Sequence, residues 1–148
     1  MGLNIEVKQE LLDELYNVGM HHYPKEFGGL LVGYYTDDYK TCFIETTILP
    51  NKYKSSRYSF ERGKEGLRKK LTEYYSNDPK LFYVGEWHTH PDSPTVPSGT
   101  DYKAMSEIAE SDDVLIQNPI LLILGITNDN YTYDFFIHHN KNLKQYDK

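Results

Sequence analysis

Two histidines separated by one residue are the part of this sequence best suited to chemistry. His88 and His90 lie in the run EWHTHP, residues 86–91. Side chains alternate between the two faces of a strand, so both imidazoles would point the same way and could reach one ion at about 2 Å. The same pattern can also be two polar residues on a solvated face, so the pair alone does not establish a metal site.

A second polar pair follows after a loop rich in proline and serine. Seven residues separate His90 from Ser98, and two more precede Asp101. The prolines can turn the chain back, so that Asp101 supplies an oxygen ligand from the start of the next helix. Ser-x-x-Asp also matches a helix capping box, which is a purely structural role. The roles are compatible, because a cap places both side chains at the helix N-terminus. Three protein ligands and an open position are typical of a catalytic zinc.

The combined pattern resembles the zinc motif of the JAMM (JAB/MPN) metalloproteases. The family also requires an upstream glutamate near a glycine-rich entry into a strand, and Glu26 in the run PKEFGGLLVG matches that place. The resemblance implies a zinc ion (Zn2+) held by His88, His90 and Asp101. It also implies that Glu26 is the general base and acid and that Ser98 helps to hold the tetrahedral oxyanion.

Two acidic residues compete with those assignments. Glu86 lies two residues before His88 and would share the metal face of a regular strand, so it could be the proton shuttle instead. Its deeper position in the sheet favours a hydrogen bond that orients one of the ligating histidines. Asp92 competes with Asp101 as the oxygen ligand, but it follows Pro91 directly and is expected to point outward.

The elements that must position these residues predict one α/β (α+β) unit. Helical spacing of apolar residues predicts helices over 7–18, 67–75 and 101–111. Apolar and β-branched runs predict strands over 30–36, 41–49, 81–90, 120–126 and 131–137. The polar segment 51–59 is expected to be an exposed loop. We therefore predict a mixed β-sheet flanked by helices. The resemblance implies that the sheet is mostly antiparallel, in the cytidine-deaminase-like JAB/MPN fold.

The other histidines and the single tryptophan are expected to be structural. His21 and His22 close the first predicted helix, where imidazolium favours the negative end of the helix dipole. His138 and His139 are expected on the surface, at the start of a polar segment that frays. Trp87, on the face opposite the two metal ligands, is expected in the core.

Composition bounds the class of protein. The 148 residues predict a single domain over 1–148, with a polar C-terminal tail from about 139. The resemblance implies that it is a JAB/MPN domain. A net charge of −6 argues against binding nucleic acid or an anionic membrane. Cys42 is the only cysteine, so any metal must be held by nitrogen and oxygen. The first residues lack a basic start and an apolar core, so a cytoplasmic location is expected.

The resemblance implies a peptidase or isopeptidase that acts at the C-terminus of a ubiquitin-like protein, in precursor processing or deconjugation. The substrate tail would add as a strand along the segment 51–60. Segment 85–91 most resembles short bacterial members found with E1- and E2-like proteins in conjugation and anti-phage defence operons. Three alternatives stay open: a RadC-like protein, a cell-wall or phage-tail peptidase of the same fold, and a non-catalytic MPN scaffold. Zinc content separates the scaffold from the enzymes, because scaffolds typically lose metal ligands.

Overall fold

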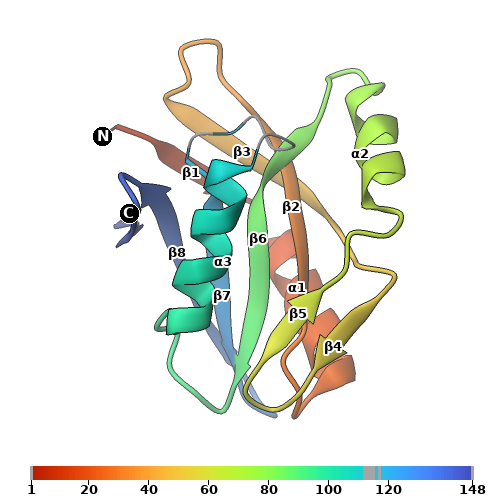
Figure 1. The fold of residues 1–148 in the computed structure, drawn as a ribbon, viewed down its shortest axis with the longest axis vertical. Helices are drawn as coiled ribbons and strands as arrows, with labels where there is room; N and C mark the ends of the chain where they lie inside the picture. The colour runs from red at the N-terminus through yellow and green to blue at the C-terminus, as the bar shows by residue number, and fades with distance from the viewer. Residues whose placement is uncertain (1, 112–115, 117, 148) are drawn as a thin grey trace.

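The computed structural model describes residues 2–111, 116 and 118–147 and places a central sheet between helices (Figure 1). Residues 1 and 148, the ends of the predicted domain, lie outside the described residues. The elements of the described chain, in sequence order, are β1 (Asn4–Val7), α1 (Gln9–His22), β2 (Gly28–Tyr35), β3 (Thr41–Ile48), β4 (Tyr53–Ser55), β5 (Phe60–Arg62), α2 (Leu67–Tyr75), β6 (Phe82–Pro91), α3 (Gly99–Glu110), β7 (Ile120–Ile126), β8 (Tyr131–His139) and β9 (Asn142–Gln145).

The central sheet has seven strands in the order β1-β3-β2-β6-β7-β8-β9. Its β1–β3 and β6–β7 pairs are parallel and the others are antiparallel. Strands β4 and β5 form a separate two-stranded hairpin. The structure therefore confirms the predicted mixed, mostly antiparallel sheet with flanking helices.

Helices cover both faces of this sheet, and residues of β7 alternate between them. Leu122 packs in the cluster that includes Leu15 of α1, whereas Leu121 packs with Met105 of α3. On the α3 side, Leu67 of α2 packs against Leu30 of β2. Every residue of β7 is buried, which explains its uninterrupted apolar sequence. Among the described residues, no helix is both long and apolar enough to cross a membrane.

Four short strands of the described chain, β1, β4, β5 and β9, were not predicted from the sequence. Strand β1 precedes α1 and pairs with β3, so the first helix begins at Gln9 rather than at residue 7. The predicted loop 51–59 contains β4, and β5 follows directly after it. Strand β9 forms within the tail that was expected to fray.

The C-terminal tail and His138 are corrections to the sequence prediction. Strand β9 pairs with β8, and Leu143 is only 9% exposed, packed with Met105 and Phe136. His138 was predicted on the surface but is buried, with its Nε2 atom 3.3 Å from Ser106 Oγ. The reason is that β8 continues to His139 beneath α3, which covers this end of the sheet.

A pair of alanine substitutions tests the packed tail. Leu143→Ala should lower the free energy of unfolding by about 2 kcal/mol, because it opens a cavity against α3. The neighbouring Lys144→Ala, at an exposed position of β9, should change it by less than about 0.5 kcal/mol. Chemical denaturation of the three proteins measures both values. Equal effects of the two substitutions would mean that the tail frays after all.

Candidate metal and catalytic site

The two histidines of the motif lie on β6, the strand between β2 and β7. Both are buried, and their Nε2 atoms are 3.2 Å apart on the face that α3 covers. The Nδ1 atom of His90 lies 2.8 Å from the carbonyl oxygen of Pro94. A carbonyl can only accept, so Nδ1 donates and the Nε2 atom of the neutral ring keeps its lone pair for a ligand.

The neighbouring strand approaches these histidines closely because it begins with glycine. Gly28 of β2 pairs with His88, and a Cβ atom at Gly28 would lie 2.1 Å from the carbonyl oxygen of Trp87 and 2.8 Å from the His88 Cβ atom. A side chain at this position would force the strands apart. Trp87 itself points to the opposite face and is buried in the main core, as predicted.

Asp101 approaches the same histidines from the first turn of α3. Its Oδ1 atom is 3.3 Å from His88 Nε2, and its Oδ2 atom is 3.6 Å from His90 Nε2. The capping box is also present: Ser98 N–H donates to Asp101 Oδ2 at 2.7 Å, and Asp101 N–H donates to Ser98 Oγ at 3.2 Å. The cap therefore holds the carboxylate against the histidines, so capping is geometrically compatible with the proposed metal-binding role.

The spacing of these donor atoms fits a tetrahedral zinc site. Zinc binds imidazole nitrogen and carboxylate oxygen at about 2.0–2.1 Å, which separates the ligand atoms of a tetrahedron by roughly 3.3–3.4 Å. The two Nε2 atoms are 3.2 Å apart, one Asp101 oxygen lies 3.3 Å from His88 Nε2, and the other Asp101 oxygen lies 3.6 Å from His90 Nε2. Each separation is close to that value, although the two oxygen distances belong to different oxygens. Two imidazoles and one carboxylate are also a donor set that zinc accepts in catalytic sites.

Glu26 lies in the segment between α1 and β2, beside the two histidines. A carboxylate oxygen of Glu26 and one ring nitrogen from each histidine all lie within 4.8 Å of one another. A cavity of about 240 Å³ opens here, and Glu26, His90 and Ser98 all line it. The structure thus brings together all five residues predicted for catalysis and metal binding.

The two carboxylates of the cluster have pKa values that are shifted in opposite directions. Burial raises the pKa of Glu26, and the opposing influence of His88 and His90 does not cancel that effect. Burial also disfavours ionised Asp101, but hydrogen bonds with His88 and His90 outweigh it and hold the pKa of Asp101 far below its usual range. Asp101 is therefore a fixed anion suited to a cation, whereas Glu26 is suited to gaining and losing a proton.

Glu86 lies on the same face of β6 as His88, as predicted, but its partners differ from the predicted histidine. Its two carboxylate oxygens accept hydrogen bonds from Arg62, from Nε at 2.7 Å and from a terminal nitrogen at 2.9 Å. The Tyr83 hydroxyl also donates to Glu86. Glu86 thus binds the β4–β5 hairpin instead of orienting a histidine. Asp92, the competitor for Asp101, accepts hydrogen bonds from Tyr23 and Arg57.

Arg62 and the serines of the hairpin were missed by the sequence reasoning. Arg62 is one of several basic residues in a polar stretch, and Ser55 and Ser56 are two of several serines there. The only sequence signal was indirect: Glu86, a charged residue on a strand predicted to be buried, required a basic partner.

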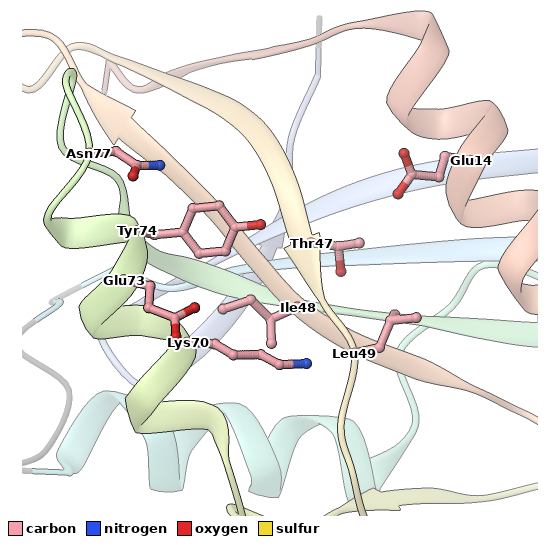
Figure 2. Close-up of a pocket in the computed structure, with 8 residues that line it drawn as sticks. All are labelled: Glu14, Thr47, Ile48, Leu49, Lys70, Glu73, Tyr74 and Asn77. Atoms are coloured by element: carbon pink, nitrogen blue, oxygen red, sulfur yellow. The ribbon is translucent and has the colours of Figure 1, made fainter.

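A larger cavity of about 530 Å³ lies elsewhere, between α2 and the end of β3. Figure 2 shows Tyr74 and Lys70 of α2 reaching toward Ile48 of β3. None of the five predicted site residues lines this cavity. Of these two cavities of the described chain, the smaller one is therefore the one lined by predicted site residues.

Comparison with known proteins identifies the family. The sequence model described as prokaryotic homologs of the JAB domain matches residues 8–138. The chain therefore belongs to the prokaryotic JAB-domain family. This finding confirms the resemblance seen in the motif.

Two characterised relatives share a name. A CD-NTase/cGAS isopeptidase of Enterobacter hormaechei subsp. hoffmannii (strain UCI 50) is 36% identical over 118 residues, which cover 79% of this chain and 62% of the relative. A protein of the same name from Pseudomonas aeruginosa (strain BWHPSA011 / Pa011) is 36% identical over 80 residues, covering 51% of this chain and 48% of the relative. The chain thus matches less than two thirds of the length of either relative.

Two solution structures share the fold at 19% identity. A protein from Desulfitobacterium hafniense has a TM-score of 0.69, with 97% of this chain and 90% of the other covered. A protein from Salinibacter ruber has a TM-score of 0.63, with 96% and 88% covered. Both likenesses concern the fold alone.

Proposed function

We propose that this chain is a zinc-dependent isopeptidase or peptidase that cleaves at the C-terminus of a ubiquitin-like protein. The observation that carries the proposal is the triangle formed by His88, His90 and Asp101, with Glu26 beside it. The relatives named isopeptidases support the reaction class. When bound, zinc would supply Lewis acidity and activate a water molecule as the nucleophile.

The side chains around the cavity would divide the remaining work. Glu26 would accept a proton from the attacking water and return it to the departing amine, a task that its raised pKa suits. Ser98 Oγ accepts the Asp101 N–H, so its own hydroxyl hydrogen can be directed into the cavity. That hydrogen would stabilise the negative charge on the carbonyl oxygen as the tetrahedral state forms.

The β4–β5 hairpin offers a place for the substrate tail. Arg57 and Tyr58, in the turn between its strands, line the cavity together with Val96 on the opposite loop. An extended C-terminal tail would lie between these walls and reach Glu26, with the hairpin supplying strand-like backbone contacts. The sequence prediction that this segment receives the tail is retained here, now with a hairpin in place of a loop.

The biological setting follows from the relatives and the resemblance. The name of both relatives joins CD-NTase/cGAS with isopeptidase, and we extend that pairing to this chain as a target class. A cytoplasmic bacterial anti-phage conjugation system, with E1- and E2-like enzymes as partners, would supply such a conjugate.

Cleavage of fusion proteins tests the proposal. The purified chain with one equivalent of zinc should cut linear fusions of bacterial ubiquitin-like proteins to a reporter domain, directly after the last residue of the modifier. A chelator should lower the rate by at least about 10², because both the nucleophile and the oxyanion depend on the ion, and added zinc should restore it. Mass spectrometry gives the cleavage position.

Two results would argue against this function. Cleavage that persists in excess chelator would exclude the metallopeptidase. A chain that binds far less than one zinc ion and cleaves none of the fusions would behave as a scaffold.

A further inference from the structure

The main chain of Glu26 is held by the β4–β5 hairpin. Glu26 precedes β2 and lies outside the central sheet. Its N–H donates to the carbonyl oxygen of Ser56 at 2.8 Å, and its carbonyl oxygen accepts a hydrogen bond from the Ser55 hydroxyl. The position of the proposed base therefore depends on where the hairpin sits.

The hairpin is too small to hold that position by itself. Strands β4 and β5 pair through three residues each, and an isolated two-stranded hairpin is marginal in water. One anchor is apolar: the Phe27 ring lies 5.0 Å from that of Tyr53 and 5.5 Å from that of Phe60. Phe27 is also bound to β6, because its N–H donates to Thr89 Oγ1 at 3.0 Å and its carbonyl oxygen accepts the Thr89 N–H at 2.9 Å. The aromatic contact therefore holds one side of the hairpin near β6 through Phe27.

The direct polar anchor of β5 to β6 is the ion pair between Arg62 and Glu86. Two hydrogen bonds of 2.7 and 2.9 Å join the guanidinium to the carboxylate, with side chains only 20% and 13% exposed. This bidentate arrangement is among the strongest polar contacts that side chains make. Tyr83 donates to the same carboxylate, and its pKa is raised by burial and by Glu86, which keeps the hydroxyl protonated.

We infer that the Arg62–Glu86 pair is a positioning pair for Glu26. It fixes the β4–β5 hairpin on β6 (Figure 1), two residues along that strand from His88. The hairpin in turn holds the backbone of Glu26, whose carboxylate lies beside the two histidines. Together with the Phe27–Thr89 hydrogen bonds, the pair sets the distance between the proton shuttle and the metal ligands. This inference rests on the proposed function, because it assigns the pair to the general base of that reaction.

Hydrogen exchange tests the structural half of the inference without any substrate. Arg62→Met should speed exchange of the Glu26 amide by at least about tenfold, because it releases the hairpin whose Ser56 carbonyl accepts that amide. The amide of Thr89 on β6, which donates to the Phe27 carbonyl, is the internal reference. Its exchange rate should change much less. An unchanged Glu26 amide, or equal acceleration of both amides, would overturn the inference.

A second variant and a matched control guard against simple misfolding. Arg62→Met with Glu86→Gln leaves no unpaired buried carboxylate, while the amide oxygen can still accept from Tyr83. Lys52→Met removes a different ion pair at the base of the same hairpin, Lys52–Glu65, whose side chains are 76% and 61% exposed. The double variant should reproduce the faster Glu26 exchange, and the control should match the wild type.

Turnover in two backgrounds tests the functional half. Against the fusion substrate, Arg62→Met should lower kcat by at least about tenfold. The zinc content should stay unchanged, because the proposed zinc ligands lie on β6 and α3. In a Glu26→Gln background, Arg62→Met should lower kcat little further, because the side chain that Arg62 helps to position is already inactive. An equal loss of kcat in both backgrounds would show that the pair contributes only to general stability. A wild type without peptidase activity would refute the proposed function and leave the exchange result standing.

Discussion

Replacing Glu26 with glutamine should lower turnover of the fusion substrate by at least about 10², while the protein keeps one zinc ion. Glutamine has nearly the same shape, and the backbone bonds of residue 26 to Ser55 and Ser56 do not involve its side chain. The neutral amide cannot accept the proton of the attacking water or return one to the departing amine. Steady-state kinetics and metal analysis of the same preparation measure both effects.

Two other glutamates serve as comparisons for this substitution. Glu65→Gln, at an exposed position, should leave kcat within about twofold of the wild type, as is usual for surface changes. Glu86→Gln should act only through the position of Glu26 and should add little in the Glu26→Gln background. If Glu26→Gln retained near-normal activity and Glu86→Gln lost it, Glu86 would be the proton shuttle.

The strands and helices that the sequence predicted correctly are those with strong local patterns. Strand β7 is an apolar run because both of its faces are buried. Such a run can be predicted from the sequence without knowing which strands pair with it. The helix at 67–75 matches α2 because its spacing is helical and Asn77 to Pro79 follow its end. In each of these cases the residues within one segment decide its structure.

The missed strands have no such pattern. Strands β1 and β9 have four residues each and lie at the two edges of the central sheet, and β4 and β5 have three each. Their pairing partners supply the hydrogen bonds that make them strands, and those partners are found only when the chain is folded. Leu143 illustrates this dependence: one apolar residue in a polar tail becomes core because α3 lies above it.

The candidate site shows the same difference between what local sequence predicts and what depends on distant partners. The spacing His-x-His, seven residues, Ser-x-x-Asp is local, and the structure brings those residues together as a strand end and a helix cap. The partner of Glu86 was not predicted, because Arg62 lies 24 residues earlier on a hairpin that the sequence did not indicate. A buried carboxylate takes the nearest guanidinium over a neutral imidazole because the pairing compensates its charge.

Asp101→Ala should weaken zinc binding by at least about 10². Loss of a partner that merely orients a ligand typically costs 10–100-fold in metal affinity, and this substitution removes a proposed ligand itself. The same change deletes half of the capping box, so its effect on folding must be separated from its effect on the metal. Competition with a chromophoric chelator gives the zinc affinity of each variant.

Ser98→Ala separates the two roles of Asp101. It removes the hydroxyl that accepts the Asp101 N–H, so the metal-free protein should lose about 1 kcal/mol of stability, as for other helix caps. Metal-free Asp101→Ala should lose a similar amount. Added zinc stabilises a folded protein in proportion to the logarithm of its affinity, so it should raise the Tm of Ser98→Ala as it does for the wild type and should barely raise that of Asp101→Ala. Equal zinc-induced shifts in the two variants would show that Asp101 only caps α3.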